Sequence, residues 1–177
     1  MHPLLIQLTN PGQKYAERAK HLLEEVGDNP DKFAIFLNAM LDPSTPANTA
    51  QYAADLSEKI SQRHPHLLLP HQDTLITALP RTHKPIIRWH LALILSYLPL
   101  LSDDPLAEVI DYVQNWLRTD PNKFLKVHCL QALANLAKKH NWLRQETILL
   151  VQEEMAKGGA AINAKGRVLL LQLASSK

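Results

Sequence analysis

The feature of this sequence that most constrains its fold is one helical pattern that recurs at an interval of 38 residues. Residues 87–98 align with residues 125–136 without a gap, and both segments begin with an apolar residue, a basic residue, one variable residue and a histidine. Residues 49–60 carry the same apolar positions 38 residues earlier, and residues 162–173 carry them 37 residues later. A lone hairpin cannot bury such a face, so the recurrence predicts helical hairpins that stack on one another.

Each repeated helix is preceded by another segment with helical periodicity, which supplies the first helix of a hairpin. The pairs define hairpins over approximately residues 31–62, 67–98, 104–139 and 143–174, and a helix over residues 13–26 is expected to cap the first of them. The predicted fold class is therefore all-α, an α-solenoid of about four helical hairpins with an N-terminal capping helix. At 177 residues the chain is the size of one such domain, so residues 1–177 are expected to form a single unit.

Proline and glycine support these boundaries. The 12 prolines look at first like evidence against helices. Many stand where a first helical turn needs no backbone donor, as Pro30, Pro85, Pro105 and Pro121 do. Gly27 follows the capping helix and is typical of a helix C-terminus. No segment shows the alternation of a strand between two hairpin turns.

Residues 120–136 resemble the second helix of a HEAT repeat, one of the armadillo-like helical-repeat families. In that family an aspartate in the turn inside the hairpin precedes an apolar-basic pair and then a stripe rich in Ala and Leu. Asp120, Leu125 and Lys126 follow this order. The previous hairpin repeats the pair at residues 87–88, whereas the first and last hairpins depart from it. The resemblance covers most of the chain from about residue 31, on a loose motif.

This resemblance implies a structural ladder and a binding function. In HEAT-like arrays the basic residue of the pair contacts a turn aspartate of a neighbouring hairpin, so Arg88, Lys126 and Asp120 are expected to form such a ladder. Most HEAT arrays serve as protein-binding scaffolds, and some HEAT-like members bind DNA and excise alkylated bases. A protein or peptide partner is the first expectation, and a nucleic acid is the alternative.

Charge, cysteine content and hydropathy exclude several other classes. The net charge is +2 with a pI near 8.7, which gives little whole-molecule attraction to nucleic acid or acidic membranes. Cys129 is the only cysteine, so no intrachain disulfide forms. The longest apolar stretch, residues 86–101, is interrupted by charged residues and proline, and the first residues lack the basic start of a signal peptide. A soluble cytoplasmic protein without a membrane partner is expected.

The best candidate for a partner-binding surface lies on one face of the central repeated helix. Trp89, Leu93 and Tyr97 stand at i, i+4 and i+8, beside the apolar stripe of the repeated pattern. The next repeated helix carries Gln131 and Asn135 at equivalent positions. Two interpretations stand: a docking patch made of these five residues, or a face covered by helices on both sides.

A second candidate surface is the basic stretch of residues 118–144, whose cations suit contacts with phosphate groups. The candidate phosphate-binding residues are Arg118, Lys123, Lys138, Lys139 and Arg144. The same side chains are also explained as solvated charges and as cations that favour helix C-termini. The sequence leaves both interpretations open.

No catalytic or metal-binding motif is found. The sequence has no nucleophile elbow, phosphate loop or dinucleotide fingerprint, and His64, His66 and His71 do not have a zinc spacing. Base excision would require several tryptophans and an aspartate in one groove, and the available set is Trp89, Trp116, Trp142 and Asp111. We therefore expect no cofactor and no metal.

The sequence leaves three hypotheses for the function. The first is a non-catalytic binding module, the second a nucleic-acid-binding protein, and the third a subunit that stacks end to end.

Overall fold

The structure is a computed structural model that describes residues 1–99 and 102–175, and within these ranges it contains α- and 3-10 helices and no strand. The α-helices are α1 (Pro3–Thr9), α2 (Tyr15–Val26), α3 (Pro30–Leu41), α4 (Ala47–Arg63), α5 (Gln72–Ala78), α6 (Pro85–Tyr97), α7 (Asp103–Thr119), α8 (Lys123–Lys139), α9 (Arg144–Ala156) and α10 (Ala160–Ser175). Three short 3-10 helices are η1 (Pro65–His71), η2 (Leu79–Arg81) and η3 (Asn141–Leu143). The all-α class predicted from the sequence is confirmed for the described residues.

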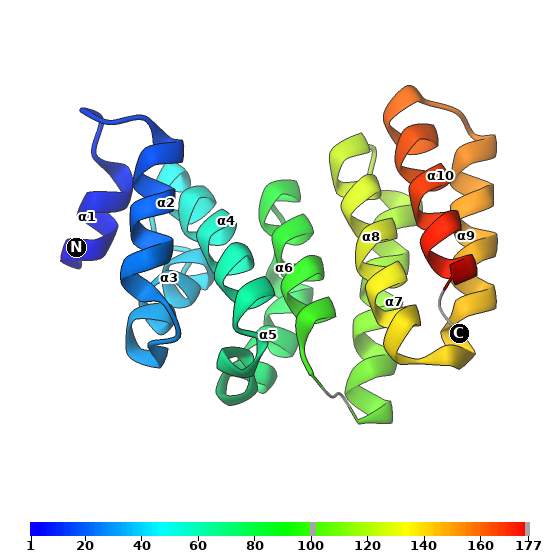
Figure 1. The fold of residues 1–177 in the computed structure, drawn as a ribbon, viewed down its shortest axis with the longest axis horizontal. Helices are drawn as coiled ribbons and strands as arrows, with labels where there is room; N and C mark the ends of the chain where they lie inside the picture. The colour runs from blue at the N-terminus through cyan, green and yellow to red at the C-terminus, as the bar shows by residue number, and fades with distance from the viewer. Residues whose placement is uncertain (100–101, 176–177) are drawn as a thin grey trace.

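The helices follow one another across the molecule in chain order. Helices α4, α6, α8 and α10 each pack on the next of the four, and α3, α7 and α9 pack on α4, α8 and α10 respectively. Figure 1 shows this order, with α1 and α10 toward opposite ends of the long axis. Helix α1 packs on α2, α3 and α4 at the N-terminal end.

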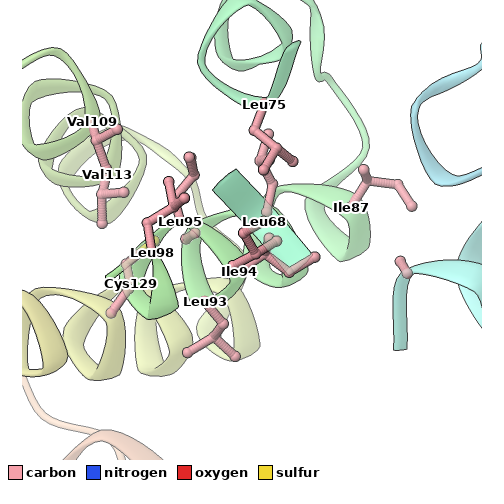
Figure 2. Close-up of a cluster of buried hydrophobic side chains, with 14 of the residues drawn as sticks. Leu68, Leu75, Ile87, Leu93, Ile94, Leu95, Leu98, Val109, Val113 and Cys129 are labelled. Carbon is pink, nitrogen blue, oxygen red and sulfur yellow. The ribbon is translucent and has the colours of Figure 1, made fainter. Parts of the chain in front are cut away.

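The positions that define the repeated pattern are all buried. They occur four to a helix, as Thr49, Ala53, Leu56 and Ile60 in α4, Ile87, Leu91, Ile94 and Leu98 in and after α6, Leu125, Cys129, Ala132 and Leu136 in α8, and Ile162, Gly166, Leu169 and Leu173 in α10. Figure 2 shows how side chains from α5, α6, α7 and α8 converge around α6. The apolar recurrence in the sequence therefore corresponds to one continuous core.

The N-terminal end carries a helix that the sequence analysis did not predict. Helix α1 begins at Pro3, and the His2 Nδ1 accepts a hydrogen bond of 3.2 Å from the backbone N–H of Leu4. Leu4 and Leu8 are buried against the rest of the fold. The segment was overlooked because seven residues hold too few turns to show helical periodicity.

The helix expected over residues 67–79 is not continuous. This segment divides into η1, α5 and η2, with Pro70 inside η1 and Pro80 inside η2. Proline has no backbone N–H and its ring clashes with the preceding turn, so a regular α-helix cannot pass through these residues. The ranges expected at residues 13–26, 31–62, 67–98, 104–139 and 143–174 begin and end within two residues of the helical segments observed.

Within the described ranges, no helix combines the length and the apolar composition needed to cross a membrane. The core instead lies between helices, where Leu, Ile and Ala side chains interlock.

Leu91→Ala tests whether the repeated positions hold the fold together. Leu91 is 0% exposed on α6, and removing a buried leucine side chain leaves a cavity, so we expect a loss of about 2–5 kcal/mol in the free energy of unfolding. The control is Leu171→Ala on α10, where the side chain is 70% exposed and the expected change is within about 0.5 kcal/mol. Urea denaturation measures both, and equal effects of the two substitutions would contradict the described packing.

Candidate functional site

Two adjoining recesses hollow the face formed by α4, α6, α8 and α10. The first, here called the aromatic recess, encloses about 380 Å³ and includes Tyr15, Tyr52, Ile86 and Trp89 in its lining. The second, here called the polar recess, encloses about 400 Å³, and its lining includes Tyr97, Gln131, Asn135, Lys138 and Lys165. Glu58 and His128 line both recesses, so the two are neighbours, and they are here together called the hollow.

Trp89, Leu93 and Tyr97 form the floor of this hollow rather than a protruding patch. Leu93 is buried at 4% exposure, while Trp89 and Tyr97 are half-buried. Neighbouring helices therefore cover Leu93 and leave Trp89 and Tyr97 partly exposed. Burial, followed by the negative charge of Glu58, raises the pKa of Tyr97 to about 12, so its hydroxyl stays neutral at physiological pH.

Trp89, His128 and Phe124 form a group of rings, here called the aromatic ledge, of which Trp89 and His128 line the aromatic recess. The rings of Trp89 and His128 are stacked, with centroids 5.0 Å apart and planes 15° apart. The ring centroids of Phe124 and Trp89 are 6.3 Å apart, and Phe124 is 67% exposed at the N-terminal end of α8. The His128 Nδ1 donates to the backbone carbonyl of Phe124 at 2.6 Å, which holds the imidazole in this stack. The ledge presents an apolar surface with little freedom to rearrange.

Gln131 and Asn135 belong to a chain of hydrogen bonds that joins α8 to α6. The Gln131 Nε2 donates to Asn135 Oδ1 at 2.8 Å, and the Asn135 Nδ2 donates to Ser96 Oγ at 3.0 Å. The Ser96 hydroxyl donates in turn to the carbonyl of Leu93 at 2.6 Å. These hydrogen bonds hold both amides in orientation, and both side chains line the polar recess.

The acidic side chains on this face already have partners. Glu58 accepts a hydrogen bond of 2.6 Å from the Nδ1 of the buried His90, which joins α4 to α6. Asp55 forms an ion pair of 2.6 Å with Lys59 and accepts a hydrogen bond from the Tyr15 hydroxyl. Burial, and then that bond to Asp55, raise the pKa of Tyr15. Neither carboxylate is placed as a general base.

The aromatic recess also uses residues that the sequence analysis did not single out as binding residues. Tyr15 of α2 stacks on Tyr52 of α4 at a centroid distance of 4.5 Å, and the Arg18 guanidinium lies 5.6 Å from the Tyr52 ring centroid. Tyr15 lies in the capping helix, outside the repeated pattern, so alignment of the repeats gives no signal for it. Its role depends on how α2 folds back on α4.

The predicted ladder residues lie between hairpins. Arg88 Nη1 is 3.0 Å from Asp120 Oδ2, and its Nε donates to the carbonyl of Thr82 at 2.8 Å. The guanidinium also lies 5.4 Å from the ring centroid of the buried Trp116. Lys126 contacts a glutamate instead of an aspartate, since its Nζ is 3.3 Å from Glu154 Oε2 on α9. Both cations therefore connect α6 or α8 to the following hairpin.

The candidate phosphate-binding residues are distributed over two ends of α8. Arg118 and Lys123 lie near its N-terminal end, while Lys138, Lys139 and Arg144 lie near its C-terminal end. Fifteen residues of helix separate Lys123 from Lys138, which is about 22 Å at 1.5 Å per residue. The Lys139 Nζ donates to the carbonyls of Ser96 and Leu98 at 2.8 and 2.7 Å. It therefore satisfies backbone acceptors at the C-terminal end of α6.

The tryptophans and aspartate considered for base excision are not gathered in one recess. Trp116 is buried beneath Arg88, and Trp142 is 63% exposed at η3. Asp111 is exposed on α7, and of these four residues only Trp89 lines either recess. Among residues 1–99 and 102–175, no group of three or more potential metal ligands is found.

Asp120→Ala tests the contact between hairpins. The substitution leaves the Arg88 guanidinium without its carboxylate and removes the hydrogen bond of 2.9 Å that the Asn122 N–H donates to Asp120 Oδ1. Because the Asp120 side chain is 8% exposed, we expect the free energy of unfolding to fall by about 2–4 kcal/mol. Glu25→Ala removes the more exposed Lys32–Glu25 pair and is expected to cost less than about 1 kcal/mol. Chemical denaturation that ranks the two in the opposite order would contradict the ladder.

Cys129 is expected to be unreactive in the folded protein. Burial raises the pKa of its thiol to about 12, so at pH 8 only about one thiol in ten thousand is ionised. A thiol-specific reagent at pH 8 should label Cys129 only after denaturant unfolds the chain. Rapid labelling of the native protein would contradict this expectation and show that solvent reaches the Cys129 side chain in α8.

Comparison of the chain with protein-family models, with curated proteins and with solved structures finds no match.

Proposed function

We propose that this chain is a non-catalytic, HEAT-like helical-repeat module that binds an extended segment of a partner protein along α4, α6, α8 and α10. The observation that carries this proposal is the pair of neighbouring recesses on that face, one aromatic and one polar. Binding sites combine apolar walls with a few fixed polar groups in this way.

The side chains of the hollow suit recognition better than chemistry. Trp89 is stacked on His128, and Gln131 is held by Asn135, so these groups are ordered before a ligand arrives. Preordered side chains lose little conformational entropy on binding. The acids on this face, Asp55 and Glu58, have partners within the protein.

The dimensions favour an extended segment as the ligand. Neighbouring packed helices have axes about 8–10 Å apart, so four helices in a row span about 24–30 Å. An extended chain covers about 3.3 Å per residue, so the face accommodates about seven to nine residues. Half-buried tryptophan and tyrosine, as in Trp89 and Tyr97, are the residue types that most often anchor such ligands.

The HEAT-like solenoid interpretation rests on recurring contacts. Helices at the repeated positions pack on one another in order. Arg88 and Lys126, which occupy the same repeated position, both form ion pairs with the following hairpin. A nucleic-acid partner is less well supported, because the cations of residues 118–144 do not form one track.

Trp89→Ala tests the proposed function. Peptides are selected from a displayed library of random decapeptides on the wild-type chain, and their dissociation constants are then measured by fluorescence anisotropy. We expect Trp89→Ala to weaken binding about 30-fold or more, because it removes a central aromatic anchor. Trp142→Ala removes an exposed tryptophan that lines neither recess and should leave affinity within about twofold.

Thermal unfolding of both variants checks that each is folded. If Trp89→Ala fails this check, Phe124→Ala replaces it, since the exposed Phe124 ring lies beside Trp89 and contributes little to the core. Failure to select any peptide, or equal loss of affinity in Trp142→Ala, would contradict the proposal.

A further inference from the structure

The polar recess contains two lysines that have no acidic partner in the described part of the chain. Lys138 of α8 and Lys165 of α10 both line it, and neither forms an ion pair with any residue in 1–99 or 102–175. The Lys138 Nζ donates to the amide oxygen of Gln172 at 3.3 Å. Two uncompensated ammonium groups therefore face the same hollow.

These lysines affect one another electrostatically. Desolvation by burial, and then the positive charge of Lys138, lower the pKa of Lys165. Bringing like charges together while removing water is unfavourable, and an anion between the two ammonium groups would offset both effects. By contrast, Lys59 and Lys126 have carboxylate partners.

The rest of the polar recess is compatible with an anion. Its one carboxylate, Glu58, lies against His90, with which it shares a hydrogen bond of 2.6 Å. Hydrogen bonds between ammonium groups and a carboxylate are among the stronger ones in proteins.

We propose that the polar recess binds the carboxylate of an aspartate or glutamate side chain in the partner segment, held between Lys138 and Lys165. This inference rests on the proposed function and adds the chemistry of the partner. The segment carries an apolar residue against the Trp89–Phe124 ledge and an acidic residue in the polar recess. A peptide is favoured over a nucleic acid because the two lysines are combined with an adjacent aromatic recess instead of a longer series of cations.

The experiment compares two double variants that remove the same charge. Lys138→Gln/Lys165→Gln alters the polar recess, whereas Arg118→Gln/Lys123→Gln removes two exposed cations near the other end of α8. Random decapeptides are selected on the wild-type chain, and affinities are measured for each selected peptide and for its copy with Asp and Glu replaced by Asn and Gln. Circular dichroism confirms that each variant is folded.

We expect the selected peptides to be enriched in Asp or Glu, and the amide copy to bind about tenfold to a hundredfold more weakly. The Lys138→Gln/Lys165→Gln variant should show the same loss with the acidic peptide and no further loss with the amide copy. The Arg118→Gln/Lys123→Gln control should bind both peptides as the wild type does.

The contrary outcomes separate this inference from the proposed function. Selected peptides without acidic enrichment, or acidic peptides indifferent to the two lysines, would overturn the carboxylate site and leave the peptide-binding function standing. No selected peptide at all would overturn both. A single-stranded oligonucleotide that binds through Lys138 and Lys165, with no selected acidic peptide, would replace the peptide by a nucleic acid.

Discussion

The mutual burial of the repeated helices is the constraint on which the rest of the structure depends. Each of α4, α6, α8 and α10 carries four buried positions at the same register, and α6 is buried through every residue from Leu91 to Ser96. An isolated hairpin would expose these side chains to water, at a cost of about 1.5–3 kcal/mol for each large one. The helices are therefore stable as packed neighbours and not singly.

The same packing produces the candidate site. Residues next to the buried stripe, such as Trp89, Tyr97 and Gln131, lie at the border between core and solvent. They are half-buried because the neighbouring helix reaches only part of each side chain. Bonds between helices, from His90 to Glu58 and from Asn135 to Ser96, hold the adjacent helices in register. The hollow is thus a consequence of the stack, with a shape that depends on these cross-helix contacts.

Much of the fold follows from the sequence because apolar periodicity indicates directly which residues are buried. Leu91 and Cys129, for example, align in the repeat and are both fully buried. The sequence also names Arg88 and Asp120, which form an ion pair in the structure. Helix α1 and the break at Pro70 were not predicted, because one is too short for periodicity and the other depends on how proline divides a segment. The recesses were not predictable, since each forms only in the tertiary structure: Tyr15 of α2 joins Glu58 of α4 in the aromatic recess, and Lys165 of α10 joins Glu58 in the polar one.

Native-state hydrogen exchange at the backbone amides of α6 tests the central claim most directly. Because α6 packs on both α4 and α8, its amides from Leu91 to Leu95 should exchange only through global unfolding, with an opening free energy equal to the free energy of unfolding. The amides of α1, at the N-terminal end of the row, should open at a lower cost. Exchange of α6 as fast as that of α1 would show that the repeated helices do not form the common core described here.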